Sequence, residues 1–523
     1  MVKSARKMII GTKHTKKMGL ALAAVTVCAW TIANAAGPET ITIDGGQIAG
    51  SIDNGVRVFK GIPFAAPPVG VLRWKAPQPV AAWSGVKRAD TFGPQCMQQP
   101  YPAGSLYATE PAPMKEDCLY LNIWSAAAAG DKRPVMVWIH GGAWTRGSGA
   151  TPTYDGAALA KKGVVVVTTN YRLGPFGFLA HPELTAESAQ RSSGNYAILD
   201  HVAALRWVQR NIAAFGGNPA NVTIFGESAG SWSVNVVQAT PLAKGLFHRA
   251  IGESGAQFAR NPRLADAEKG GVALAKAVGA DSLAALRAVP AEKILEVQSF
   301  RSGGNVDGWV LPDEVRAIFA QKKQNDVPIL IGSNANEWTT LSSPAQFPKT
   351  LDDFNRRMAA QFPGLARELD AVYPVKADAD IAEAMLGLGR DQTFTLEMRT
   401  WARMVTAGGR KAFLYQFTRI PPGPNPTLGA YHASEIAYAF NNVGVRPWAT
   451  DADRRLADQM SSYWVNFATT GDPNGRGLPA WTPYELAEEP YLDLGDAVQV
   501  RHHLLKAQLD FLEQAQQRRQ VSQ

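Results

Sequence analysis

Six short apolar runs recur along the chain, and each is rich in β-branched or aromatic residues. Runs of this kind are typical of strands that are buried on both faces of a sheet. The stretches between them carry apolar residues at helical spacing, most clearly over residues 198–215. The runs cover residues 135–140, 164–171, 221–225, 249–254, 327–334 and 411–417. This alternation predicts an α/β fold with a large, mostly parallel central sheet flanked by helices.

The N-terminal part of the chain has a different pattern. Residues 41–65 alternate between apolar and polar positions and turn at glycine and asparagine, which indicates antiparallel hairpins at one edge of the sheet. Further along the chain we find no internal repeat and no linker-like stretch. We therefore predict a single domain over residues 36–523.

The first 35 residues have the three parts of a secretory signal peptide. Residues 1–17 hold six basic side chains and no acidic one, residues 18–32 are apolar, and the sequence ANAA follows. The apolar run is short for a membrane span. We expect cleavage after Ala35 and export to the periplasm or the extracellular medium, with an uncleaved anchor as the alternative.

Export changes what the charge and the cysteines indicate. Loss of the basic leader removes most of the formal charge of +8, so charge gives no reason to expect a nucleic acid or an anionic membrane as partner. Cys28 is lost with the leader, which leaves Cys96 and Cys118. In an exported protein these two suggest one disulfide, with two unpaired buried thiols as the alternative.

The stretch TIFGESAGSWS puts Ser228 between the end of a predicted strand and the start of a predicted helix. A serine whose hydroxyl protrudes there needs a very sharp turn, and Gly226 and Gly230 relieve the crowding on either side. The first N–H groups of the helix would stabilise negative charge near the serine. The pattern predicts a nucleophile elbow, and a structural glycine–serine turn is the alternative.

A serine nucleophile needs a base and an acid that orients the base, and in this class of fold the chain order is serine, acid, histidine. His432 follows the last apolar run and is the best base, because His248 comes too early and the remaining histidines lie in a polar tail. Glu337 follows the run over residues 327–334 and is the candidate acid. A structural histidine and a solvated glutamate are the alternatives.

The sequence also offers oxyanion donors. The stretch HGGAW, residues 140–144, follows a predicted strand and would present free backbone N–H groups, as would Ala229 just after the serine. A glycine-rich turn without a catalytic role is the alternative. His432 and Glu435 have H-x-x-E spacing, but one such pair is too few ligands for a metal, so we expect no metal and no cofactor.

Five longer stretches carry further information. They are FKGIPFAAPPVGVLRW, EDCLYLNIW, NYRLGPFGFL, ALRWVQRNIAAFGGNPANVTIFGESAG and YWVNFATTGDPN. These stretches resemble the type-B carboxylesterases, the family that includes the cholinesterases and the para-nitrobenzyl esterases. The resemblance implies an α/β-hydrolase fold in which inserted loops and helices cover the active site. It also implies that Ser228 is the nucleophile, Glu337 the acid and His432 the base.

The resemblance extends to supporting positions. The family's oxyanion donors fall on Gly142, Ala143 and Ala229, and its first disulfide falls on Cys96 and Cys118, in agreement with the argument from export. Glu227 would stabilise the imidazolium of the base as it forms, with hydrogen-bonded packing as the alternative. Two ion pairs between signature stretches are also expected, and they are Arg73–Glu116 and Arg172–Asp200.

Three positions depart from the family pattern, because Ala143, Trp338 and Ala433 stand where glycine is common. None of these changes removes a reacting atom, but a side chain at each position is expected to alter the shape of its loop. Trp338 together with Trp144 and Trp232 suggests an aromatic substrate pocket. Ordinary core packing of these tryptophans is the equal alternative.

These features predict a secreted serine carboxylesterase that acts on a small-molecule ester through an acyl-enzyme. Two inserted regions, residues 95–115 and 260–301, are expected to shape access to its site. An amidase or carbamate hydrolase with the same triad is the alternative. A non-catalytic cholinesterase-like binding protein is a remote alternative, since such a protein is expected to lack a triad residue.

Overall fold

The structure is a computed structural model, and it describes residues 39–521 except 103, 111 and 424. The signal peptide expected over residues 1–35 lies outside the described residues. Residues Pro38–Gln523 form a compact unit of their own. Among the described residues, no helix is both long and apolar enough to cross a membrane.

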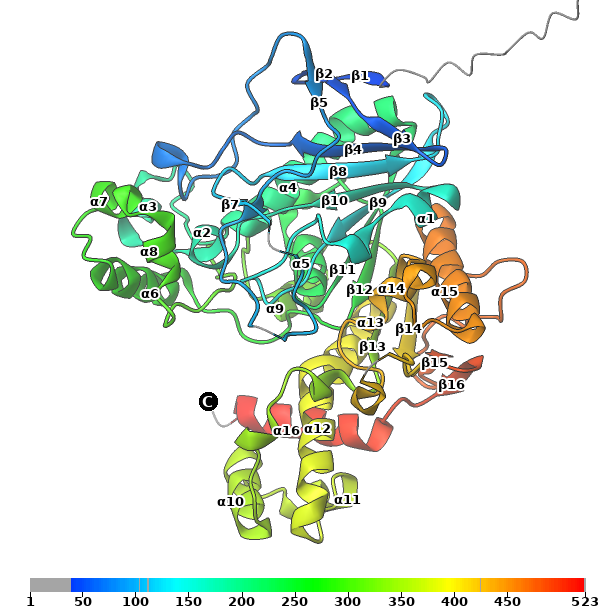
Figure 1. Cartoon of the computed structure of the whole chain (residues 1–523). Coiled ribbons are helices and arrows are strands. Elements are labelled where there is room, and N and C mark those ends of the chain that lie inside the picture. The colour runs from blue at the N-terminus through cyan, green and yellow to red at the C-terminus, as the bar shows by residue number, and fades with distance from the viewer. Residues whose placement is uncertain (1–38, 103, 111, 424, 522–523) are drawn as a thin grey trace, which may run out of the picture. The chain divides into compact units, whose positions relative to one another are not determined.

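An eleven-stranded sheet forms the centre of the described chain (Figure 1). The strand order is β16-β15-β14-β13-β12-β11-β9-β10-β8-β4-β3. Neighbouring strands from β10 to β15 are parallel, and the strands at both ends of the sheet pair antiparallel. The strands are β3 Ser51–Asp53, β4 Val56–Pro63, β8 Tyr120–Ser125, β9 Arg133–Ile139, β10 Val165–Thr169, β11 Gly217–Glu227, β12 Arg249–Glu253, β13 Ile329–Asn334, β14 Ala412–Phe417, β15 Pro490–Leu494 and β16 Val498–His502.

The six apolar runs correspond to β9 through β14, so the prediction of a mostly parallel sheet is confirmed. The hairpins predicted at the edge are only partly right. Strands β3 and β4 lie at the edge as expected, but β1 (Thr40–Ile43) and β2 (Gly46–Ala49) form a separate small sheet with β5 (Val86–Arg88). They leave the main sheet because β2 pairs in parallel with β5, a partner distant in sequence.

Helices cover both faces of the sheet because successive strand residues point to opposite sides. On β9, Val135, Val137 and Ile139 enter one core, whereas Met136 and Trp138 enter the other. The helices on the first face are α4 Tyr196–Asn211, α5 Ala229–Ala239, α9 Val315–Ala320 and α13 Leu396–Ala407. The helices on the second face are α1 Ala157–Lys161, α14 Ile436–Ala439 and α15 Asp451–Thr470.

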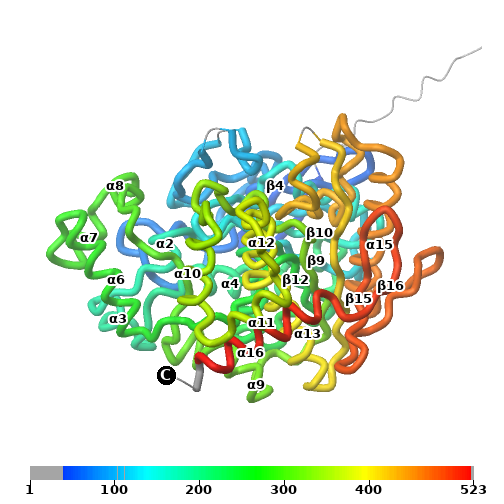
Figure 2. The backbone as a smooth tube through the Cα atoms, turned by 90° about the horizontal axis from the view of Figure 1, so that it is seen from below, coloured from blue at the N-terminus to red at the C-terminus, as the bar shows by residue number. Residues whose placement is uncertain are grey.

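A third core lies in a helical cluster that the sequence did not predict (Figures 1 and 2). It contains α10 Leu351–Gln361, α11 Ala366–Val372, α12 Ile381–Arg390 and the late helix α16 Lys506–Val521. A π-helical turn, η8 (Asp391–Thr395), joins α12 to α13. Ion pairs fasten α16 to α13, since Arg399 lies 2.6 Å from Asp510 and Arg403 lies 2.8 Å from Glu513.

The two predicted inserted regions both lie outside the main sheet. Residues 260–301 contain three helices at the left of Figure 1, of which α6 contacts α3 and α8 contacts α2. Residues 95–115 form a loop that begins with β6 and ends with β7. The elements named here are α2 Gly174–Phe178, α3 Pro182–Glu187, α6 Leu264–Ala277, α7 Leu283–Ala288, α8 Ala291–Leu295, β6 Gln95–Cys96 and β7 Met114–Lys115.

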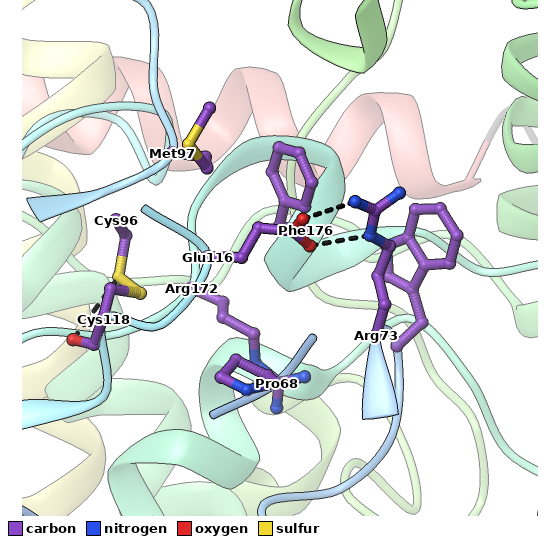
Figure 3. A pocket seen from close by; sticks show the side chains of 9 residues that line it. Pro68, Arg73, Cys96, Met97, Glu116, Cys118, Arg172 and Phe176 are labelled. Atoms are coloured by element: carbon purple, nitrogen blue, oxygen red, sulfur yellow. Dashed lines mark hydrogen bonds and ion pairs between the residues drawn. A yellow bond between two sulfur atoms is a disulfide. The ribbon is translucent and has the colours of Figure 1, made fainter. Parts of the chain in front are cut away.

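The disulfide and the two ion pairs are present as predicted. Cys96 and Cys118 are bonded and close the loop over residues 96–118. Figure 3 shows Arg73 and Glu116 facing each other beside this disulfide, joined by two hydrogen bonds. In the second pair, Arg172 Nη2 lies 2.7 Å from Asp200 Oδ1, and both side chains are buried. These contacts fix the loop and the neighbouring strand ends beside the sheet.

Candidate active site

The turn between β11 and α5 has the geometry of a nucleophile elbow. Ser228 lies between Glu227, the last residue of β11, and Ala229, the first residue of α5, and its φ of 57° is strained for a residue with a side chain. A Cβ on Gly226 would lie 2.6 Å from the carbonyl oxygen of Ile139, and one on Gly230 would lie 2.0 Å from it. Both glycines are therefore required for the close approach of β9.

The predicted oxyanion loop lies against this turn. A Cβ on Gly141 would come within 3.0 Å of the Ser228 Cβ. Three consecutive residues, Gly142, Ala143 and Trp144, have φ values of 104°, 54° and 57°. This left-handed run turns the backbone sharply, and the Arg146 N–H stabilises it by donating to the Gly142 carbonyl at 3.0 Å. The backbone of this loop at Gly141 thus lies beside the serine.

The predicted base and acid are in direct contact. His432 Nδ1 lies 2.6 Å from Glu337 Oε2, and both side chains are almost fully buried. Nδ1–H donating to the carboxylate leaves Nε2 free to accept a proton. Glu337 follows β13 and His432 follows β14, so the carboxyl ends of these neighbouring parallel strands bring the two residues together. Ser228 follows β11 at the same edge of the sheet, two strands from β13.

Glu227 approaches the other nitrogen of the imidazole. Its Oε1 lies 3.1 Å from His432 Nε2, within ion-pair distance but without hydrogen-bond geometry. Burial raises the pKa of Glu227 well above its usual range, and the nearby Glu337 and Glu253 add to this effect. Within the part of the chain that the structure describes, no hydrogen bond joins the Ser228 hydroxyl to His432. Such contacts are often loose in enzymes without substrate.

Two further glutamates, which the sequence did not single out as site residues, are buried behind this pair. Trp464 Nε1 donates to Glu253 Oε1 at 2.9 Å, and the Asn334 amide donates to Glu435 Oε2. Burial raises the pKa of Glu253 to about 8 and that of Glu435 well above its usual range, so their neutral forms are favoured near pH 7. The only signal in the sequence was the H-x-x-E spacing of Glu435.

The cluster of carboxyl groups is not a metal site by its geometry. Across the described residues, no group of three or more histidine, cysteine, aspartate or glutamate side chains is arranged to hold a metal ion. The carboxyl groups are instead held by N–H donors from tryptophan, asparagine and the backbone.

Two aromatic residues next to the base could not be identified from the sequence. The Tyr107 hydroxyl, in the disulfide-closed loop, lies 3.2 Å from the His432 carbonyl oxygen and 2.6 Å from Thr340 Oγ1. The ring of Phe394, on the π-helical turn η8, lies 4.9 Å from the imidazole between centroids. Both contacts join the base to segments far away in the chain, where local patterns carry no information.

The three tryptophans predicted near the site have different surroundings. Trp144 is buried, donates to Ser233 Oγ at 2.8 Å and contacts the half-buried Trp232 at 5.3 Å between ring centroids. Trp338 is half-buried and contacts Phe394. A Cβ on Gly389 would lie 2.4 Å from Trp338 Nε1, so glycine in α12 makes room for the large side chain that follows the predicted acid.

The family model described as "Carboxylesterase family" matches residues 37–512. The fumonisin B1 esterase of Sphingopyxis macrogoltabida is 38% identical over 458 residues, which is 83% of this chain and 82% of that protein. The para-nitrobenzyl esterase of Bacillus subtilis is 36% identical over 469 residues, which is 85% of this chain and 92% of that protein. Among solved structures, a carboxylesterase of Geobacillus stearothermophilus is similar with a TM-score of 0.80 and 36% identity, covering 90% of this chain and 99% of that one.

Proposed function

We propose that this chain, a carboxylic ester hydrolase that belongs to the carboxylesterase family and has the α/β-hydrolase fold, cleaves small-molecule esters through Ser228, His432 and Glu337. The observation that carries the proposal is the contact of 2.6 Å between His432 Nδ1 and Glu337 Oε2 beside the strained Ser228 turn. A buried histidine oriented by a buried carboxylate next to a protruding serine is the arrangement that acyl transfer requires.

The reaction proceeds in two steps. His432 Nε2 takes the Ser228 proton as Oγ attacks the ester carbonyl, and Glu337 stabilises the imidazolium. The backbone N–H groups of Gly142, Ala143 and Ala229 donate to the oxyanion. His432 then gives its proton to the leaving alcohol, and in the second step it activates the water that releases the acid from Ser228.

Glu227 supports the same charge from the other side of the ring. Its carboxyl group is buried within ion-pair distance of Nε2, so its ionised form is favourable while the imidazolium exists. Residues of this chain supply every group that these steps use, and no cofactor takes part in them.

Hydrolysis of a ladder of para-nitrophenyl esters, from acetate to palmitate with benzoate, tests this proposal. The wild type is expected to cleave some of these esters, and Ser228→Ala is expected to lose the activity while keeping its melting temperature. Full activity in Ser228→Ala would overturn the proposal. Rates with an ester and an amide of the same acid distinguish an esterase from an amidase or carbamate hydrolase. Failure of an organophosphate to label Ser228 would favour a non-catalytic binding protein.

We also propose that the protein is exported to the periplasm or the medium. The leader pattern over residues 1–35 supports this, and so does the Cys96–Cys118 disulfide, since disulfides persist in oxidising compartments. N-terminal sequencing of the protein from the periplasmic and culture fractions is expected to begin at Ala36. A cytoplasmic protein that retains residues 1–35 would contradict the proposal.

A further inference from the structure

The proposed acid and base are carried by two separate loops that must keep a fixed spacing. Glu337 follows β13, and His432 lies 95 residues later in the loop after β14. A displacement of one loop against the other would break the 2.6 Å contact between the two side chains. The groups that join these loops therefore determine whether the base is oriented.

Asn334, the last residue of β13, connects both loops and is fully buried. Its backbone N–H donates to Glu337 Oε1 at 2.7 Å. Its side-chain nitrogen donates to the Tyr431 carbonyl oxygen at 2.8 Å and to Glu435 Oε2. One residue thus holds the acid through its main chain, while its amide contacts the base loop on both sides of His432.

We infer that Asn334 is a positioning residue, which sets the spacing between Glu337 and His432 by holding the acid with its backbone N–H and the base loop with both hydrogens of its amide. The inference rests on the proposed function, because it assigns a role toward the Ser228–His432–Glu337 triad. Asn334 acts through these two residues and is not itself assigned to touch substrate.

The chemistry of the site requires an amide at position 334. The Tyr431 carbonyl is an acceptor only, and Glu435 Oε2 also accepts from this amide although the neutral form of Glu435 is favoured. A side chain with two N–H donors therefore satisfies both acceptors. An aspartate has no such donors at neutral pH. It would also add a carboxylate to a buried group that already contains Glu227, Glu253, Glu337 and Glu435.

Asn336 provides a matched control two residues further along the same loop. Its side chain is exposed, and its Oδ1 accepts from the Ala430 N–H at 2.9 Å. An aspartate at position 336 keeps this acceptor, whereas an aspartate at position 334 loses two donors. The same substitution is therefore expected to impair catalysis at position 334 and to leave it almost unchanged at position 336.

The experiment measures kcat, KM, the pH profile of kcat/KM and the melting temperature of Asn334→Asp and Asn336→Asp with a para-nitrophenyl ester. Asn334→Asp is expected to lower kcat by about 10- to 100-fold with a smaller change in KM, because the base is misplaced. Asn336→Asp is expected to stay within about twofold of the wild type.

The pH profile separates positioning from a purely structural role. The titratable groups around His432 and Asn334 are the four glutamates, three tyrosines and Arg390, which donates to the Ala335 carbonyl at 3.0 Å. The tyrosines are Tyr107, Tyr415 and Tyr431. An additional carboxylate among them stabilises the imidazolium, so the acid limb of kcat/KM is expected to move to higher pH in Asn334→Asp. Asn334→Ser, which loses one donor without adding charge, is expected to lower kcat and leave the acid limb unmoved.

Combining Asn334→Asp with Glu435→Gln is expected to restore part of kcat. The amide introduced at position 435 can donate to the carboxylate introduced at position 334, so the hydrogen bond between the two positions is kept with donor and acceptor exchanged. Equal kinetics in Asn334→Asp and Asn336→Asp would overturn the inference. A lower kcat in Asn334→Asp that is accompanied by a lower melting temperature and an unchanged pH profile would overturn it as well. If Asn334→Asp does not fold, Asn334→Ser and the double variant decide the question by the same kcat criterion. Retained activity in Ser228→Ala would instead mark failure of the proposed function.

Discussion

Glu227 Oε1 lies 3.1 Å from His432 Nε2, while the other ring nitrogen of His432 contacts Glu337. The imidazole is thus placed between two buried carboxyl groups, one at the end of β11 and one on the loop after β13. Burial makes the ionised form of Glu227 unfavourable unless a positive charge stands beside it, and the imidazolium of the proposed mechanism is such a charge.

Glu227→Gln is therefore expected to lower kcat by about 10- to 100-fold without unfolding the protein, because an amide cannot supply the negative charge that stabilises the imidazolium. The rate with a para-nitrophenyl ester and the melting temperature are measured together. Unchanged kinetics at an unchanged melting temperature would reduce Glu227 to a packing role.

Two buried histidines predict loss of stability in acid. Burial lowers the pKa of His140 to about 4 and that of His201 to about 3, and neither ring nitrogen of His201 has a hydrogen-bond partner. The unfolded chain binds protons at these groups below about pH 6.5 and the folded chain does not, so stability falls as the pH drops from 6.5 toward 4.

His201→Phe should flatten this acid dependence, since the ring contact with Tyr171 is retained and the proton site is removed. The expected difference from the wild type is at most about 3 kcal/mol between pH 6.5 and pH 4. Denaturant unfolding across this range measures it. If the free energies of unfolding of the wild type and of His201→Phe fall in parallel down to pH 4, His201 does not contribute to the loss of stability in acid.

Ala433, directly after the proposed base, has a φ of 68° where the family commonly has glycine. Left-handed backbone costs an alanine about 1 kcal/mol, partly offset by the greater freedom of glycine in the unfolded chain. Ala433→Gly is expected to leave activity intact and to raise the free energy of unfolding by at most about 1 kcal/mol. As a control, Ala203→Gly within α4 is expected to lower the free energy of unfolding by about 1 kcal/mol, because glycine destabilises a helix.

Replacement of both Cys96 and Cys118 by serine should lower stability by about 3 kcal/mol, the value expected for a closed loop of this size. Activity should fall as well, since the loop carries Tyr107, whose hydroxyl reaches the His432 carbonyl. Melting temperature and kcat of the double variant, compared with the wild type in the absence of reductant, measure both effects. Equal melting temperatures would contradict the stabilising role.

The sequence was sufficient for features that depend on local pattern or on long family signatures. The apolar runs predicted β9 through β14, and the spacing of Gly226, Ser228 and Gly230 predicted the strained turn. The order of Ser228, Glu337 and His432 along the chain predicted which residues the strand ends would bring together. Each of these features is encoded within a few residues or in strand order.

Contacts between distant segments could not be predicted in the same way. Glu253 is a site residue only because Trp464 on α15 donates to it, and Phe394 is one only because a π-helical turn directs it at the imidazole. The helical cluster of α10, α11 and α12 was missed, and part of its core comes from α16, which is distant in the sequence. Similarly, β2 left the main sheet to pair with the distant β5.

The ion pairs between α16 and α13 have a consequence for the order in which the parts of the protein fold. The turn η8, which carries Phe394 to the imidazole, lies in contact with α16, and α16 is made of residues 506–521. A polypeptide that emerges N-terminus first, from a ribosome or through an export channel, can form the Ser228 turn long before those residues appear. The surroundings of His432 are completed only at the end of synthesis or translocation. A partly emerged chain would then have the Ser228 turn before the surroundings of its proposed base are complete.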